Sequence, residues 1–168
     1  MNIVYFKGVP CHTCGQLPEI GSKAPGFNLL SSDMKEVDDR TFRNKRVILN
    51  IFPSLDTDVC ATSVRRFNAE AASLPNTQVI CISMDLPFAA KRFCTTDGID
   101  NLIVASAFRS PMFSQKYGVG IVDGPLAGLL ARAVLVMDEG FHVRYVELVN
   151  EITHEPNYVA AFDALRAK

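Results

Sequence analysis

One stretch, residues 50–60, constrains the fold more than any other part of the sequence. It reads Asn-Ile-Phe-Pro-Ser-Leu-Asp-Thr-Asp-Val-Cys and completes an apolar run that begins at Val47. Pro53 ends the strand, because proline has no backbone N–H to donate to a neighbouring strand. The polar residues after it are typical of turns and helix N-caps, and from residue 59 apolar residues recur every three or four positions. The sequence therefore predicts a buried strand, a polar loop and a helix with Cys60 in its first turn.

Cys60 in this position has two interpretations. It continues the apolar stripe of the helix, four residues before Val64, and free cysteines are commonly buried and inert. However, a helix N-terminus gathers unpaired backbone N–H groups and the positive end of the helix dipole, which favour an anion such as a thiolate. Reactive thiols that ionise easily are found at such helix starts. The setting favours a reactive thiol and leaves the core interpretation open.

A reactive thiol needs a further group near it. A free thiol has a pKa near 8.5, so only a few per cent is ionised at neutral pH. Bringing a thiol to a pKa of about 6 takes roughly 3.4 kcal/mol at ~1.36 kcal/mol per unit, and a helix N-terminus supplies only ~0.3–2 kcal/mol. One hydrogen bond from a charged donor, worth ~1.5–3 kcal/mol, covers the difference. We therefore expect a buried cation beside Cys60.

Arg132 is the strongest candidate for that cation. It lies among small and apolar residues at the start of a strand, where a charge needs a partner; a side chain that extends its charge into solvent is the alternative. Thr57 offers a hydroxyl that both donates and accepts, and helix N-capping is its other role. Cys94 lies in the last turn of the next helix. Helix ends fray, so Cys94 occupies a polar and potentially mobile place; the alternative is an ordinary surface or half-buried cysteine.

The other apolar patterns predict alternating strands and helices. Strands are expected at 46–52, 78–84, 101–105, 133–137 and 143–148, and helices at 59–74, 85–94, 111–117 and 156–167. Asp85 is placed to cap the helix that carries Cys94. This order predicts a three-layer α/β arrangement, and the late strand pair suits a thioredoxin-like fold. Strands are also expected at 2–7 and 11–17, on either side of a turn, and they predict an N-terminal β-hairpin extension. Because the length suits one domain, we expect residues 1–168 to form a single thioredoxin-fold domain.

The composition excludes several functional classes. The chain has 168 residues, of which 48% are hydrophobic and 21% charged, and its net charge is −1. These values are ordinary for a globular domain and give no reason to expect nucleic acid or a membrane as a partner. No apolar run approaches the roughly 20 residues that span a bilayer, and the first residues do not resemble a signal peptide. We therefore expect a cytoplasmic protein, in which structural disulfides are rare.

The remaining cysteines are expected to have packing roles. Cys11-His12-Thr13-Cys14 is a C-x-x-C sequence, but such redox motifs act at a helix start that follows a strand. If this segment is extended, residues three apart point to opposite faces, which opposes a disulfide between them. A zinc site needs four ligands, and this segment offers three at most. Cys81 lies inside a predicted buried strand.

The motifs together resemble a known family. Phe52-Pro53-Ser54-Leu55-Asp56-Thr57-Asp58-Val59-Cys60 resembles the peroxidatic-cysteine motif of peroxiredoxins, Pro-x-x-x-Thr-x-x-Cys, and Leu49 to Ser54 resembles the thiol peroxidase subfamily in particular. The resemblance covers nearly the whole chain from about Gly21 onward. Further matching motifs are Gly21-Ser22-Lys23-Ala24-Pro25, Arg92-Phe93-Cys94, Tyr117-Gly118-Val119, Asp123-Gly124-Pro125-Leu126 and Ala131-Arg132-Ala133.

The resemblance implies an atypical 2-Cys peroxiredoxin that reduces hydrogen peroxide and organic hydroperoxides. Cys60 would be the peroxidatic thiolate, shielded from water by Pro53, with Thr57 and Arg132 beside the thiolate and the peroxide. Cys94 would convert the resulting sulfenic acid into an intramolecular disulfide, which thioredoxin would reduce by exchange. The family needs no metal, haem, flavin or other cofactor, and it is usually homodimeric.

Two other functions compete with this one. The first is a thioredoxin-like disulfide reductase that uses Cys11 and Cys14. The second is a thioredoxin-fold binding domain without enzymatic activity. Consumption of peroxide in the presence of thioredoxin separates all three.

Overall fold

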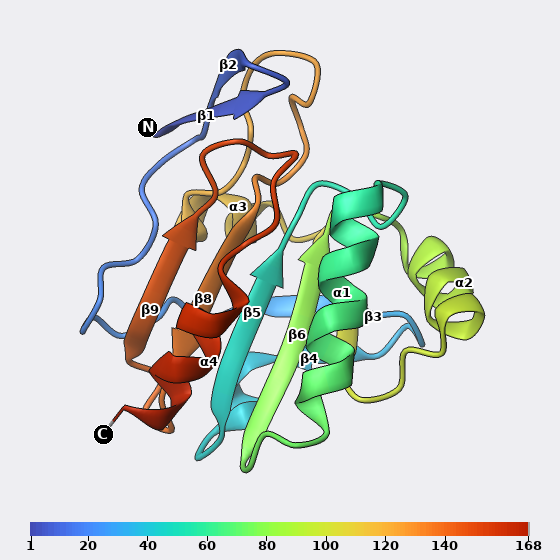
Figure 1. Ribbon diagram of the computed structural model, residues 1–168, viewed down its shortest axis with the longest axis vertical. Coiled ribbons are helices and arrows are strands. Elements are labelled where there is room, and N and C mark those ends of the chain that lie inside the picture. The colour runs from blue at the N-terminus through green and yellow to red at the C-terminus, as the bar shows by residue number, and fades with distance from the viewer. Residues whose placement is uncertain (168) are drawn as a thin grey trace.

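Within residues 1–167, which the computed structural model describes, the chain forms a central sheet of seven strands (Figure 1). These strands are β3 (Asn28–Ser31), β4 (Glu36–Asp38), β5 (Arg46–Ile51), β6 (Thr77–Ser83), β7 (Ile103–Ser106), β8 (Ala133–Met137) and β9 (Val143–Leu148). Their order across the sheet is β4-β3-β7-β6-β5-β8-β9. The three central strands β5, β6 and β7 run parallel, and β8 pairs antiparallel with β5. The loops that follow β5 and β6 therefore leave the sheet at the same edge.

Helices cover both faces of the sheet. They are α1 (Asp58–Ala71), α2 (Pro87–Asp97), α3 (Pro111–Tyr117) and α4 (Tyr158–Arg166), and a short 3-10 helix, η1 (Asp39–Phe42), follows β4. Figure 1 shows α1 and α4 in front of the sheet and α3 behind it. The strands are buried on both sides because alternate residues face the two layers: Ile48 packs toward α1 and α4, whereas Leu49 packs toward α3. The expected three-layer α/β, thioredoxin-like fold is confirmed.

The N-terminal hairpin forms a separate small sheet. It consists of β1 (Ile3–Phe6) and β2 (Val9–His12), paired antiparallel with Val4 opposite Cys11. The return strand was expected over 11–17, but it ends at His12. Backbone hydrogen bonds join the hairpin to the segment after β9, from Tyr5 N to the Asn150 carbonyl (2.7 Å) and from Ile152 N to the Tyr5 carbonyl (2.8 Å). The extension is thus attached to the domain next to the C-terminal end of the sheet.

The prediction for Asp85 as a helix cap is wrong. Helix α2 begins at Pro87 and its N-cap position is Leu86, which provides no side-chain cap. The carboxylate of Asp85 turns away from the helix and accepts hydrogen bonds from the loop before α1. Helix α4 also begins later than expected, at Tyr158, where the side chain of Asn157 accepts from Ala160 N. Among the described residues, no helix has the length and apolar character that crossing a bilayer requires.

Candidate active site

Cys60 lies in the first turn of α1, as the sequence predicts. β5 ends at Ile51, Pro53 and the polar residues after it form the loop, and α1 begins at Asp58. Thr57 has an extended backbone at the N-cap position. The Cys60 side chain is completely buried, with 0% exposure, and packs in the apolar layer between the sheet and the helices. The core interpretation is therefore correct about burial, and the chemistry depends on what contacts the sulfur.

Arg132 contacts that sulfur directly. Its Nη2 donates to Cys60 Sγ over 3.2 Å, and its Nε donates to the carbonyl oxygen of Ile152 over 2.8 Å. The register of the sheet explains the contact: Ala133 pairs with Ile51, so the residue before β8 lies beside the loop that follows β5. Arg132 is only 1% exposed. A buried guanidinium needs a partner of opposite charge or strong acceptors, and an ionised Cys60 supplies one.

A second feature of Arg132 points to a ligand. Its Nη1 is buried and has no hydrogen-bond partner among residues 1–167, and buried donors are almost always satisfied. Arg132 also lines a cavity of about 410 Å³. Pro53, Ser54, Thr57 and Val59 form the wall on the α1 side of that cavity, and Phe6, Leu126, Leu129 and Ile152 give the opposite wall its apolar character. A small polar group with an apolar substituent fits a cavity of this kind.

Thr57 lies at the entrance of the same cavity. Its hydroxyl donates to the carbonyl oxygen of Ser54 over 3.1 Å instead of capping α1. The hydroxyl oxygen is thereby oriented and can still accept a hydrogen bond. Pro53 is buried and lines the same cavity. The structure thus brings Cys60, Arg132, Thr57 and Pro53 together.

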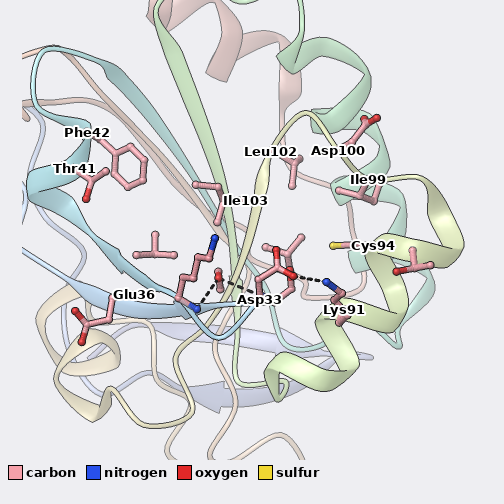
Figure 2. Close-up of a pocket in the computed structure, with 16 residues that line it drawn as sticks. Asp33, Glu36, Thr41, Phe42, Lys91, Cys94, Ile99, Asp100, Leu102 and Ile103 are labelled. Carbon is pink, nitrogen blue, oxygen red and sulfur yellow. Dashed lines mark hydrogen bonds and ion pairs between the residues drawn. The ribbon is translucent and has the colours of Figure 1, made fainter.

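Cys94 lies elsewhere. It is half-buried in α2 and lines a larger cavity, of about 610 Å³, between that helix and the β3–β4 hairpin. Figure 2 shows its sulfur directed into this cavity, beside the ion pair between Lys91 and Asp33. Burial raises the pKa of the Cys94 thiol, and the Asp33 carboxylate raises it further. Cys94 and Cys60 pack in one apolar layer, but Cys94 lines the larger cavity whereas Cys60 is fully buried beside Arg132. All five cysteines of the described chain are free.

The other three cysteines have structural surroundings. Cys11 is fully buried in β2, and a Cβ added to Gly124, whose φ is +72°, would lie 2.9 Å from its sulfur. Cys14 donates to the carbonyl oxygen of Ser114 over 3.1 Å. Cys81 is fully buried in β6, and burial raises the pKa of its thiol to about 12. Within residues 1–167, no group of three or more His, Cys, Asp or Glu side chains is arranged to hold a metal ion.

Sequence reasoning missed three residues of the site: Phe6, Ile152 and Asp85. The hairpin contributes Phe6 to the lining of the cavity that Arg132 faces, and Ile152 both lines that cavity and accepts a hydrogen bond from Arg132 through its carbonyl. Asp85 organises the loop before Cys60 although its position suggested a cap for α2. All three act across large separations in sequence, so no local pattern marks them. The only available signal was that Asp85 and Pro53 both follow buried parallel strands, whose ends meet at one edge.

Comparisons with known proteins identify relatives along nearly the whole chain. The Redoxin family model matches residues 19–162. A thiol peroxidase from Corynebacterium glutamicum is 51% identical over 165 residues, which cover 98% of this chain and 99% of that protein. A thiol peroxidase from Mycobacterium tuberculosis is 52% identical over 167 residues, which cover 99% and 100%.

A solved structure gives the same result for the fold. The crystal structure of a peroxiredoxin-like protein from Aquifex aeolicus matches with a TM-score of 0.92 at 39% sequence identity, covering 99% of this chain and 96% of that one. Since both sequence relatives are thiol peroxidases and span nearly the whole chain, this protein belongs to the Redoxin family and, within it, to the thiol peroxidases of the peroxiredoxin group.

Proposed function

We propose that this thiol-dependent peroxidase uses Cys60 as its nucleophile toward hydroperoxides and Cys94 as its resolving thiol. The observation that carries the proposal is the 3.2 Å contact between Arg132 Nη2 and Cys60 Sγ, inside a fully buried site. A charged donor this close stabilises a thiolate over a thiol. The thiolate is the form of cysteine that attacks peroxides.

The first step consumes the peroxide. The Cys60 thiolate attacks the outer oxygen of ROOH, a sulfur–oxygen bond forms, and the oxygen–oxygen bond breaks. Cys60 becomes a sulfenic acid, and the departing RO⁻ takes up a proton and leaves as an alcohol or as water. The free Nη1 of Arg132 supplies donors where negative charge develops on the peroxide oxygens, and the Thr57 hydroxyl can accept the hydrogen bond of the peroxide. The apolar wall of Phe6, Leu126 and Leu129 supports organic hydroperoxides as substrates besides hydrogen peroxide.

The second step forms the disulfide. The Cys94 thiolate attacks the sulfur of the Cys60 sulfenic acid, a sulfur–sulfur bond forms, and hydroxide leaves and becomes water. Cys60 is fully buried against Arg132, whereas Cys94 faces the cavity beside the β3–β4 hairpin. We therefore expect the first turn of α1, the end of α2, or both to unwind before the sulfurs meet. The raised pKa of Cys94 keeps it a thiol until that movement exposes it. A dithiol reductant, which we propose to be thioredoxin, then returns both cysteines to thiols by exchange.

The proposal includes a homodimer in the cytoplasm. Leu86 and Phe88 at the start of α2, and Phe108 and Met112 near the start of α3, expose large apolar side chains. Such side chains support a protein contact, and a second copy of this chain is the partner we propose. The free cysteines suit a reducing compartment.

A peroxidase assay tests the proposal. Purified wild type and Cys60→Ser are mixed with hydrogen peroxide, thioredoxin, thioredoxin reductase and NADPH, and the absorbance of NADPH is followed. We expect the variant to fold as the wild type does and to lose turnover completely. Retained turnover in Cys60→Ser would refute the assignment of the nucleophile.

A further inference from the structure

A carboxylate from a neighbouring segment holds the loop that precedes Cys60. Asp85 lies between β6 and α2, and its Oδ1 accepts a hydrogen bond from Ser54 Oγ over 2.8 Å. Its Oδ2 accepts from the backbone N–H of Leu55 over 2.7 Å and from Ser83 Oγ over 2.7 Å. Two of these three donors, Ser54 Oγ and Leu55 N, belong to the loop, so side-chain hydrogen bonds join the loop to the segment that follows β6.

The surroundings make these hydrogen bonds strong. Leu55 is 2% exposed and Ser83 is 1% exposed, so water is largely excluded from the donors. Among residues 1–167, Asp85 takes part in no ion pair, and its charge is met by hydrogen-bond donors alone. Hydrogen bonds to a charged acceptor are about twice as strong as those between neutral groups. Without the carboxylate, the buried N–H of Leu55 would lose its acceptor, which is costly.

Ser54 connects Asp85 to Thr57, which lines the cavity. Its carbonyl oxygen accepts from the hydroxyl of Thr57 over 3.1 Å and from Thr57 N over 3.3 Å. Its own hydroxyl accepts from Asp56 N over 3.2 Å while it donates to Asp85. Ser54 and Thr57 both line the cavity that Arg132 faces. The position of the Thr57 hydroxyl therefore depends on Asp85 through a chain of two hydrogen bonds.

The geometry points to Asp85 as a positioning residue for the attack of Cys60 on the peroxide. Asp85 does not touch the reacting atoms: it fixes Ser54 and Leu55, and through Ser54 it aims the Thr57 hydroxyl at the bound hydroperoxide. This inference rests on the proposed role of Cys60 as the nucleophile. It adds a residue that the peroxidatic motif does not contain, because Asp85 lies well outside residues 53–60.

The experiment separates the attack step from the disulfide step. Reduced protein is mixed with hydrogen peroxide, quenched at intervals and analysed by mass spectrometry, which counts sulfenic acid and disulfide separately. The variants are Asp85→Ala, Asp85→Asn and Ser54→Ala. Asp138→Asn is the matched control, because Asp138 also accepts two backbone hydrogen bonds (from Gly140 and His142, both 2.9 Å) but organises the turn between β8 and β9.

We expect a graded loss in the rate of Cys60 oxidation. Asp85→Ala should slow it by about tenfold or more, the effect of losing a charge-assisted hydrogen bond. Asp85→Asn should fall between Asp85→Ala and wild type, because the amide oxygen still accepts from Leu55 N–H. Ser54→Ala should also slow the oxidation of Cys60, whereas Asp138→Asn should oxidise within about twofold of the wild-type rate. The rate at which the Cys60 sulfenic acid is converted into the disulfide should not fall in any of these variants.

Several results would overturn the inference. One is an unchanged rate of Cys60 oxidation in Asp85→Ala. Another is an equal loss in the rates of Cys60 oxidation and disulfide formation that Asp138→Asn also shows, because that result indicates a general structural effect. If circular dichroism shows that the Asp85 variants do not fold, Ser54→Ala decides the question, and an unchanged oxidation rate in it refutes the inference. Failure of the proposed function is distinguishable, since it appears as oxidation of a cysteine other than Cys60 in the wild type.

Discussion

Replacing Arg132 with methionine removes the cation from Cys60 while keeping a side chain of similar length. The substitution deletes the 3.2 Å hydrogen bond from Nη2 to Cys60 Sγ. A hydrogen bond from a charged donor is worth about 1.5–3 kcal/mol, which at ~1.36 kcal/mol per tenfold change slows a step that depends on it about 10- to 150-fold. The unpartnered Nη1 is removed as well, and deleting a donor that stabilises developing charge costs roughly another 10²–10³-fold in rate. Attack on hydrogen peroxide should therefore slow by roughly 10³-fold or more.

Two assays divide this loss into its parts. The rate of alkylation by iodoacetamide at neutral pH, measured on the Cys11→Ser, Cys14→Ser, Cys81→Ser, Cys94→Ser background, reports the reactivity of the Cys60 thiol alone. This rate should fall in Arg132→Met. The rate of peroxide consumption should fall further than the alkylation rate, because it also depends on the second donor. Arg132→Lys keeps the charge but not the second donor, so it should be intermediate. An alkylation rate in Arg132→Met equal to that of the protein with Arg132 would refute the role of Arg132 in activating Cys60.

Three further predictions follow from the arrangement of the site. Cys94→Ser should reduce one peroxide per subunit, stall with Cys60 as a sulfenic acid and then over-oxidise. In wild type treated with peroxide, hydrogen exchange should rise near residues 58–64 and 90–98. A disulfide from Cys60 to Cys81, Cys11 or Cys14 in the mass spectrum would refute the assignment of Cys94. The double variant Cys11→Ser, Cys14→Ser should keep its thioredoxin-dependent rate, and a tenfold loss or stoichiometric zinc in purified wild type would contradict this. Desolvation raises the pKa of Glu151, but hydrogen bonds from Gly8, Thr153 and Lys7 outweigh it and lower the pKa from its ordinary 4.5 to about 2. The Glu151 carboxylate therefore stabilises the hairpin above about pH 4.5, and this contribution is lost as the pH falls toward 2. Amide protection in residues 3–12 should fall over that range in wild type and show no such step in Glu151→Gln.

The parts of the site that can be predicted from the sequence are those that depend on residues close together in the chain. A strand, a proline and an amphipathic helix occur within a short stretch, so the pattern alone places Cys60 at a helix start. Arg132 stands out because a charge among apolar residues is conspicuous and because the energy of the thiolate requires a cation. Its contact with Cys60 comes from the antiparallel register of β8 on β5, which the chain's local pattern does not specify.

The parts that sequence reasoning missed depend on pairings between distant segments. The sequence assigns Asp85 to the helix beside it, because an acidic residue before a proline is a common cap. In the structure a stronger set of donors, from Ser54 and Leu55, competes for the same carboxylate. Likewise, how α1 and α2 lie over the sheet decides that Cys60 is fully buried beside Arg132 while Cys94 lines a cavity next to α2. Local preferences do not determine which of several donors a carboxylate finally meets.

The attachment of the hairpin has a consequence for how the enzyme is made. The backbone of Lys7 bonds to the side chain of Glu151 across 144 positions, and Tyr5 bonds to the backbone of Asn150 and Ile152. The carbonyl of Ile152 in turn holds Arg132. During synthesis the hairpin leaves the ribosome before the rest of the domain. His12 meets its partners Val122 and Asp123 before Tyr5 meets Asn150 and Ile152. Cys60 and Arg132 can meet earlier, but the arginine gains its second hydrogen bond only when residues up to Ile152 have been translated.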